Sequence, residues 1–142
     1  MAKSNEYRAW HEATKKMCEV YYINWDLEEV GICLEGTCTT VPIKNVILMR
    51  NTGKQDISGE YVYEGDFIES HQGTQILAIL MLIQYGTYEA YCPADKEYMD
   101  NVGFFVEAVK YPPMPLGPLS DYAKVIGNVY ENADWLDKSD DI

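Results

Sequence analysis

Cys33-Leu34-Glu35-Gly36-Thr37-Cys38 carries the clearest hairpin signal in the chain. The Glu-Gly pair separates two β-prone segments, and a two-residue loop that contains glycine is typical of a β-hairpin. Such a turn pairs Leu34 with Thr37 and places the two cysteines directly opposite each other on adjacent strands. We therefore predict a hairpin with arms at residues 28–33 and 37–43. Within it we expect two packed thiols, with a cross-strand disulfide as the alternative.

The same alternation of turns and short strands extends over the rest of the chain. Turn residues recur roughly every 8 to 12 residues with β-branched or aromatic segments between them, a spacing that favours an all-β fold. Turns are predicted at 51–54, 56–59 and 64–66, where glycine supplies a backbone geometry that other residues resist. The further strands expected are residues 7–10, 17–25, 46–50, 61–63, 67–69, 104–111 and 124–130.

One long apolar segment, residues 74–84, cannot be assigned from its periodicity alone. We predict a strand there that turns back through Gly86 into a second strand at residues 87–91. A helix over residues 75–84 is the alternative.

The C-terminal part of the sequence mixes helical and extended signals. One or two helical turns are expected over residues 93–101, because Pro93 suits a helix N-terminus. The proline-rich residues 111–118 should form an extended, polyproline-like connector with little ladder bonding, and a ligand for a proline-binding module is the alternative. Asn132 can cap a short helix over residues 133–138, and an acidic tail follows at 139–142.

Length and composition place the chain among ordinary globular proteins. Its 142 residues are 47% hydrophobic and 24% charged, which is too apolar for a disordered chain. The longest apolar run, residues 76–83, is far shorter than the roughly 20 residues needed to span a bilayer. We therefore expect neither an integral membrane protein nor an N-terminal secretion signal. Four cysteines are too few to suggest a disulfide scaffold in a chain of this length, which indicates a reducing compartment, so a cytoplasmic protein is expected.

Net charge is strongly negative and unevenly distributed. The chain carries −12, of which residues 1–60 contribute −2 and residues 61–142 contribute −10. Such a field repels DNA, RNA and anionic lipid, so direct nucleic-acid or membrane binding is not expected. An acidic surface suits a basic partner instead, including a protein whose usual ligand is nucleic acid. The alternative is that the charge serves solubility.

The sequence contains none of the local motifs that mark common catalytic or metal sites. It has no nucleophile elbow, phosphate-binding glycine loop, dinucleotide fingerprint or His-Glu-x-x-His, and its two histidines, His11 and His71, are isolated. We therefore expect no enzyme, no cofactor and no metal. Glu64, Asp66 and Glu69 crowd one turn and could hold a divalent cation, but a solvated acidic face is preferred.

Tyrosine is unusually frequent, with 12 copies against three each of Phe and Trp. Its ring is apolar on one side and its hydroxyl prefers water, which suits oligomer or partner interfaces. Ordinary packing on the outside of a β structure explains the same composition, and both explanations stay open.

Three stretches of the sequence occur together in a recognisable order. Tyr7-Arg8-Ala9-Trp10 with Lys15-Lys16-Met17 stands near the N-terminus, and Val125-Ile126-Gly127-Asn128-Val129-Tyr130-Glu131-Asn132 stands near the C-terminus. Between them, Val46-Ile47-Leu48-Met49-Arg50-Asn51-Thr52-Gly53 is followed by Asp56, Gly59 and Tyr63-Glu64-Gly65-Asp66. This set resembles the YopX family of phage and prophage proteins over residues 6–69 and 123–137. Residues 70–122 show no pattern that we can align with it.

The resemblance implies a fold and an origin but no activity. It implies a mainly β protein, with a small SH3-like barrel, an additional N-terminal β-hairpin region and a short C-terminal helix. It also implies self-association and a phage or prophage source, and hence a bacterial host cell. We therefore divide the chain into an N-terminal β region at 1–60, a barrel region at 61–138 with a variable insertion at 70–122, and the tail at 139–142.

The sequence favours a non-enzymatic phage accessory protein that acts by binding. Our first hypothesis is an acidic inhibitor of a host nucleic-acid-directed protein, active in defence or processing. One alternative is an oligomer that sequesters a nucleotide-like molecule, with tyrosines stacking on bases and Arg8, Arg50 and Lys54 meeting phosphate. Another is a structural or assembly protein. The residues predicted to face a basic partner are Glu64, Asp66, Glu69, Glu89, Asp95, Glu97 and Asp100.

Overall fold

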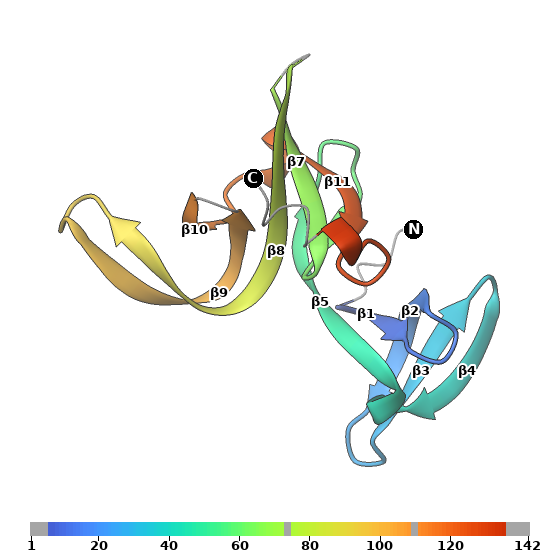
Figure 1. Ribbon diagram of the computed structural model, residues 1–142. Helices are drawn as coiled ribbons and strands as arrows, with labels where there is room; N and C mark the ends of the chain where they lie inside the picture. The colour runs from blue at the N-terminus through green and yellow to red at the C-terminus, as the bar shows by residue number, and fades with distance from the viewer. Residues whose placement is uncertain (1–5, 73–74, 109–110, 136–142) are drawn as a thin grey trace. The chain divides into compact units, whose positions relative to one another are not determined.

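The protein consists of two units, each of which is described by itself (Figure 1). The computed structural model describes residues 6–72, 75–108 and 111–135. Unit 1 comprises residues 1–53 and unit 2 comprises residues 54–142. The boundary between the units therefore falls after residue 53, a few residues before the boundary that we predicted after residue 60.

Unit 1 is an antiparallel sheet with the strand order β4-β3-β2-β1-β5. Short turns connect its first four strands. A 3-10 turn, η1 (Ile43–Asn45), leads from the fourth strand into the fifth. The strands are β1 (Tyr7–His11), β2 (Lys16–Asn24), β3 (Glu29–Leu34), β4 (Thr37–Pro42) and β5 (Val46–Gln55).

The β3–β4 hairpin has the predicted register. Glu35 and Gly36 both have positive φ, 50° and 82°, which is the geometry of the two-residue turn that fits twisted strands. Leu34 pairs with Thr37 and Cys33 with Cys38. The cysteines form a disulfide, so the preference for two packed thiols is wrong. Their Cα atoms lie only 4.0 Å apart across the ladder, which brings the two sulfurs within bonding reach.

The core of unit 1 follows from the alternation of its strands. Side chains at every second position point to one face of the sheet, where they are removed from water. Val30 and Ile32 on β3 occupy this face, and both are at most 3% exposed. The buried residues of this cluster are Ala9, Cys18, Val20, Val30, Ile32 and Val46.

Unit 2 contains a second antiparallel sheet, with the strand order β10-β9-β8-β7-β11. Its core gathers on the central strands and on a short helix, where Ile68, Ile83, Val106 and Leu119 are at most 1% exposed. The elements are β6 (Tyr61–Tyr63), β7 (Asp66–Gln72), β8 (Gln75–Cys92), β9 (Glu97–Ala108), β10 (Tyr111–Pro115), α1 (Leu119–Tyr122) and β11 (Ala123–Asn128). In the strand order of the first sheet, β6 follows β5.

The strand over residues 75–84 is confirmed, but the hairpin through Gly86 is wrong. β8 continues to Cys92, and β9 begins at Glu97, so the turn lies at residues 93–96. The helical turns predicted over 93–101 are therefore also wrong. Gly86 pairs with Gly103 across the ladder, and φ is 152° and 150° at these two residues. A glycine that we assigned to a turn instead permits an unusual backbone geometry inside a long strand.

The turn predicted at residues 51–54 is also wrong. β5 runs through this segment to Gln55, with Gly53 at a φ of 79°. The side-chain oxygen of Asn51 accepts a hydrogen bond from the Gly53 N–H at 2.8 Å, which replaces a ladder partner locally. The turn predicted at 56–59 is confirmed, with Gly59 at a φ of 86°.

The proline-rich segment is extended, as predicted, but residues 111–115 form a strand of the sheet and not a connector with little ladder bonding. β10 pairs with β9 through Tyr111, Met114 and Pro115, with a register shift between the first two. It lies at the edge of the sheet, where proline is tolerated because one side of the strand needs no ladder donors. The helix α1, which follows β10 in the sequence, was not predicted.

The C-terminal end of the described chain departs from the predicted cap. Asn132 accepts from the Asn128 N–H through its side chain, at 3.1 Å, and from the Trp135 N–H through its carbonyl oxygen. The helix predicted over 133–138 lies partly outside the described residues, and the tail predicted at 139–142 lies wholly outside them.

The protein is thus mainly β, with two antiparallel sheets and one short α-helix in the described residues. The SH3-like barrel implied by the family resemblance stays a prediction. No helix in the part of the chain that the structure describes is long and apolar enough to cross a membrane.

A buried carboxylate connects the 56–60 turn of unit 2 to its edge strand β11. Asp56 is 2% exposed. Its Oδ1 accepts hydrogen bonds from the backbone N–H groups of Ser58 (2.8 Å) and Glu60 (3.0 Å). Its Oδ2 accepts from the N–H of Val125 at 3.0 Å, and the ammonium of Lys124 lies 3.9 Å away. One side chain therefore holds the turn and β11 together.

We predict that Asp56→Asn destabilises the protein by about 3 kcal/mol. An amide has one acceptor oxygen, so at least one of the three backbone donors would face an N–H₂ group in a site without water. Urea unfolding followed by circular dichroism measures the loss. Asp95→Asn, at an exposed turn, is the matched control and should change stability by less than about 0.5 kcal/mol. Equal stability of the two variants would contradict the role given to Asp56.

Candidate protein-interaction surface on the β8–β9 arm

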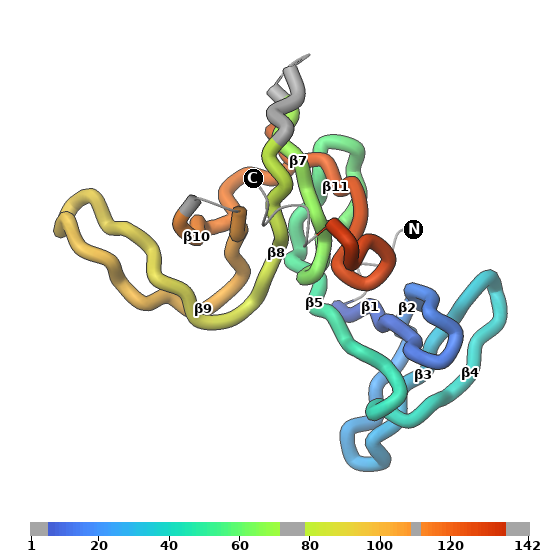
Figure 2. Tube along the Cα trace, viewed as in Figure 1, coloured from blue at the N-terminus to red at the C-terminus, as the bar shows by residue number. Residues whose placement is uncertain are grey.

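The outer part of the β8–β9 hairpin is a two-stranded ribbon. In the described residues, β7 pairs with β8 only as far as Leu82, and β10 pairs with β9 only as far as Phe105. Residues 87–102 lie beyond both limits, and we call them the arm. Figures 1 and 2 show the arm extending away from the rest of its sheet. A two-stranded ribbon is marginally stable in water by itself, so its long root in the sheet is what holds it in place.

One face of the arm carries three cross-strand pairs of different chemistry. Tyr91 lies opposite Tyr98, Glu89 opposite Asp100, and Thr87 opposite Val102. All six side chains are exposed, and successive pairs lie two residues apart, so they point to the same side. We call these six residues the arm face.

Aromatic rings pack at the tip and at the root of the arm. The rings of Tyr91 and Tyr98 meet edge to face with centroids 5.3 Å apart, although the residues are 49% and 58% exposed. At the root, Tyr85 meets Phe104 at 4.9 Å. On the opposite face, Tyr88 stacks on the buried Phe105 at 4.6 Å. The rings at the tip are therefore held in place and remain accessible to a partner.

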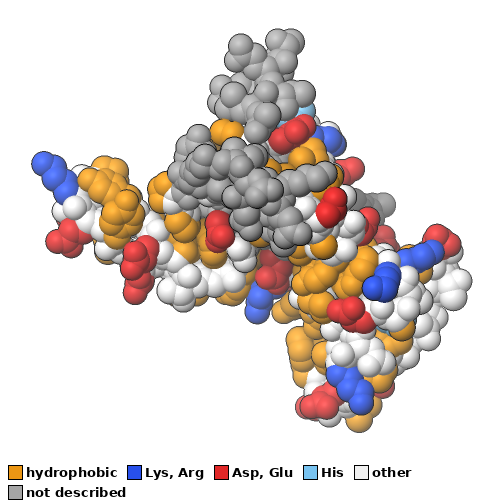
Figure 3. All heavy atoms as spheres, in the orientation of Figure 1, with side chains coloured by type: hydrophobic (Ala, Val, Ile, Leu, Met, Phe, Trp, Pro, Cys, Tyr) orange, Lys and Arg blue, Asp and Glu red, His pale blue; other side chains and the backbone are white. Residues whose placement is uncertain are grey.

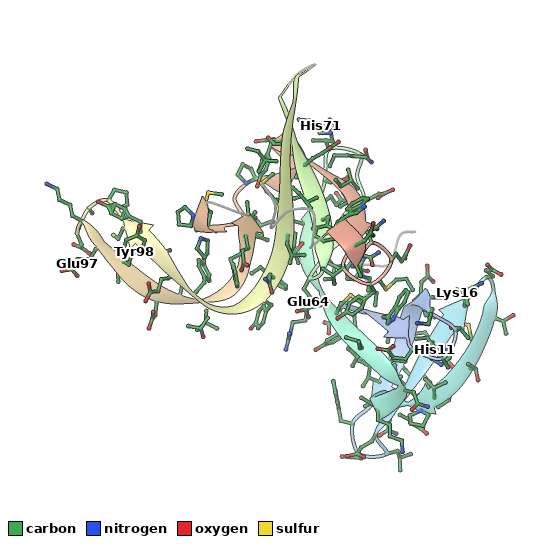
Figure 4. All side chains as sticks on the ribbon, in the orientation of Figure 1. His11, Lys16, Glu64, His71, Glu97 and Tyr98 are labelled. Atoms are coloured by element: carbon green, nitrogen blue, oxygen red, sulfur yellow. A yellow bond between two sulfur atoms is a disulfide. The ribbon has the colours of Figure 1, made fainter. Side chains whose placement is uncertain are left out.

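Four of the seven predicted carboxylates come together on the arm, where Lys96 is the single Lys or Arg. Glu89 and Asp100 are direct cross-strand neighbours. Asp95 lies in the turn, where its Oδ2 is 3.7 Å from the Cys92 sulfur, and Glu97 begins β9. Figure 3 shows acidic and hydrophobic side chains next to each other on the arm, and Figure 4 labels Glu97 and Tyr98 near its end.

The other three predicted carboxylates lie on the β6–β7 turn and on β7. Asp66 is 1% exposed, and its Oδ2 accepts a hydrogen bond from the Tyr63 N–H at 2.8 Å. It shapes the turn and does not present its charge to a partner. Glu69 is half-buried, with its Oε1 2.8 Å from Nε2 of His71. Glu64, which Figure 4 labels, is also half-buried. Only the arm therefore gathers predicted carboxylates on an exposed surface.

Sequence reasoning missed the tyrosine pair at the tip. It placed residue 91 on one strand and residue 98 in a helix, so the two could not be neighbours. The signal was the turn-prone Pro93-Ala94-Asp95-Lys96 segment midway between them, which matches a hairpin loop as well as a helix start.

Other reactive groups in the described chain do not form a site. Burial raises the pKa of the Cys18 thiol and outweighs the opposite effect of Lys16, which keeps the sulfur protonated and poorly nucleophilic. Burial also raises the pKa of Tyr122, whose hydroxyl donates to the Leu116 carbonyl at 2.9 Å. No group of three or more His, Cys, Asp or Glu residues in the described ranges is placed to hold a metal ion.

Of the three basic residues considered for phosphate binding, Arg50 and Lys54 lie on β5 and Arg8 lies on β1. Arg8 on β1 and Arg50 on β5 belong to unit 1, whereas Lys54 begins unit 2. The ammonium of Lys54 donates to the carbonyl oxygen of Gly117 at 2.8 Å. At least this cation already has a structural partner.

The comparisons with known proteins agree with the fold. A crystal structure of protein EF1440 from Enterococcus faecalis resembles the chain with a TM-score of 0.54 and 20% sequence identity. The alignment covers 92% of this chain and 96% of that one, a likeness that shows the fold alone. None of the curated proteins matches the chain.

A family model covers nearly the whole chain. The model described as YopX protein matches residues 6–137. That match includes residues 70–122, where we found no alignable pattern, so the β8–β9 arm falls inside the region that the family model covers. The chain belongs to the YopX family.

Proposed function

We propose that the protein is a non-enzymatic phage or prophage accessory protein whose arm binds and inhibits a basic host protein that is directed at nucleic acid. We also propose that it acts in the cytoplasm of the bacterial host as a homo-oligomer. The observation that carries this proposal is the arm face, where an exposed like-charge pair adjoins an exposed tyrosine pair.

The like-charge pair supports a cationic partner. Carboxylates directly opposite each other on a ladder destabilise it, by roughly 0.2–1 kcal/mol for a cross-strand pair. A Lys or Arg side chain placed between Glu89 and Asp100 turns this repulsion into two attractions. The pair thus costs the free protein stability that a basic partner restores, as expected for a binding surface.

The neighbouring tyrosines support a protein as the partner. Tyr and Trp dominate the energetics of protein interfaces, because they bury a large area at low entropic cost. Proteins that bind nucleic acid expose Arg and Lys to meet phosphate, so an acidic ribbon with aromatic side chains competes for the same surface. The attraction between the partner's Arg and Lys side chains and the carboxylates of the arm also accelerates association at low salt.

The nucleotide-binding alternative has less support. Phosphate would approach four carboxylates and a single lysine on the arm, and the Lys54 ammonium is already hydrogen-bonded. No observation favours a purely structural role over binding.

We predict that Glu89→Lys weakens partner binding while stabilising the arm. The new lysine forms a cross-strand ion pair with Asp100 and removes the charge pattern that attracts a basic partner. Capture from host lysate at low and high salt measures binding, and thermal unfolding measures stability. Wild-type protein should retain a partner at low salt and lose it at high salt, and the variant should retain at least ~10-fold less at low salt.

The matched control changes the same charge elsewhere. Glu12→Lys and Glu60→Lys alter exposed acids outside the arm and should leave capture unchanged. Loss of capture by these controls as well would mean that net charge matters and the arm does not. Absence of any salt-labile partner for the wild-type protein would contradict the proposal.

We predict that Tyr98→Ser also weakens capture, through lost contact area and not through charge. Because the number of charges is unchanged, the slope of binding against salt concentration should stay the same while the affinity falls about 10-fold. Isothermal titration with the captured partner checks both values. Tyr85→Ser, at the root of the arm, is the control, and an equal effect there would argue that the ring acts through folding.

A further inference from the structure

We propose that unit 1 contains a second binding site, a groove that takes the cationic side chain of an arginine or lysine. The groove has a volume of about 350 Å³, and its aromatic lining comes from Tyr7, Tyr21, Tyr22 and Trp25, with Glu6 beside them. We call it the aromatic groove. All of its residues belong to unit 1, so the inference goes beyond the function proposed for the arm.

A β-bulge builds one side of this groove. Val20 pairs with Ile32 and Tyr22 pairs with Gly31, so Tyr21 is an extra residue on β2. The bulge interrupts the alternation and places two successive tyrosines over the same neighbour, with ring centroids 4.9 Å apart. Gly31 is needed there because a Cβ atom at this position would overlap both rings. The local sequence is therefore arranged to keep both tyrosines on one surface.

The rings form walls, not a flat platform. Tyr21 and Tyr22 meet at an interplanar angle of 71°, and Tyr7 and Trp25 meet at 73° with centroids 6.5 Å apart. Near-perpendicular neighbours expose ring faces that point in different directions. Tyr21 and Trp25 are also 53% and 61% exposed, which is unusual for rings of this size. A compact group that enters the groove can therefore meet several ring faces at once.

Charge selects the ligand. Glu6 is the one charged residue among the described residues that line the groove, and no Lys, Arg or His lines it. Arg50 lies opposite Tyr7 in the ladder but is not part of the lining. The faces of aromatic rings are electron-rich and attract Lys, Arg and organic cations, and a carboxylate adds to that attraction. A nucleotide would find rings to stack on but would bring its phosphate towards Glu6.

The test titrates the full chain with N-acetyl-arginine methylamide and follows Trp fluorescence and two-dimensional NMR. The citrulline analogue has nearly the same shape without the charge, and AMP tests the nucleotide explanation. We expect the arginine amide to shift the signals of Tyr21 and Trp25, and to bind at least ~10-fold more tightly than the citrulline analogue. Equal binding of the two amides, or tighter binding of AMP, would overturn the proposal.

Variants assign the effect to the groove. Trp25→Ala and Glu6→Gln should each weaken binding of the arginine amide several-fold, whereas Trp25→Phe should retain most of it. Tyr98→Ser, an exposed tyrosine on the arm, is the matched control and should bind normally. Circular dichroism confirms that each variant is folded, and normal binding by folded Trp25→Ala would refute the site.

The two proposals fail separately. Glu89→Lys should lose the salt-labile partner and still bind the arginine amide, if both are right. If the amide leaves the signals of Tyr21 and Trp25 unchanged, the groove proposal fails and the arm proposal stays intact, because the two sites share no residue.

Discussion

The buried carboxylate of Asp56 is the interaction on which unit 2 depends. It accepts three backbone hydrogen bonds, two inside its own turn and one from Val125 on β11. The Ile57 N–H adds a bond to the carbonyl oxygen of Ala123, the first residue of β11. A charged acceptor without access to water makes these bonds strong and makes their loss costly. They hold an edge strand in place, so β7 is paired on both sides, and β7 in turn supports β8.

The arm depends on this support. Its strands are the continuation of β8 and β9, whose inner ends bury Ile83, Phe105 and Val106 in the sheet. The buried side chains at the root therefore stabilise the hairpin, and the tip can carry residues that do not contribute to folding. The Glu89–Asp100 pair is such a case, since adjacent like charges weaken the ladder that carries them. In unit 1 the bulge at Tyr21 similarly departs from regular pairing to place side chains on a surface.

Sequence reasoning succeeded where a local signal has one meaning. The Glu35-Gly36 turn, the Leu34–Thr37 register and the extended proline segment all follow from backbone preferences of a few residues. It failed where one signal has several meanings. Glycine at position 86 suits a turn as well as a kinked strand, and its pairing with Gly103 settles the choice from 17 residues away in the chain. For the candidate site, the acidic character of the arm was predicted, and its tyrosine pair was not.

The sequence alone determined the mainly β class, the family, the uneven charge and the hairpin at residues 33–38, because each depends on composition or on neighbours along the chain. The tertiary structure decided which acids face water, whether the cysteines are bonded, and which tyrosines meet. Asp66 and Glu89 are both carboxylates on strands, yet the first is buried and accepts a hydrogen bond from a turn N–H, whereas the second is exposed on the arm. That difference arises from pairing between distant segments, and pairing register is a property of the folded sheet.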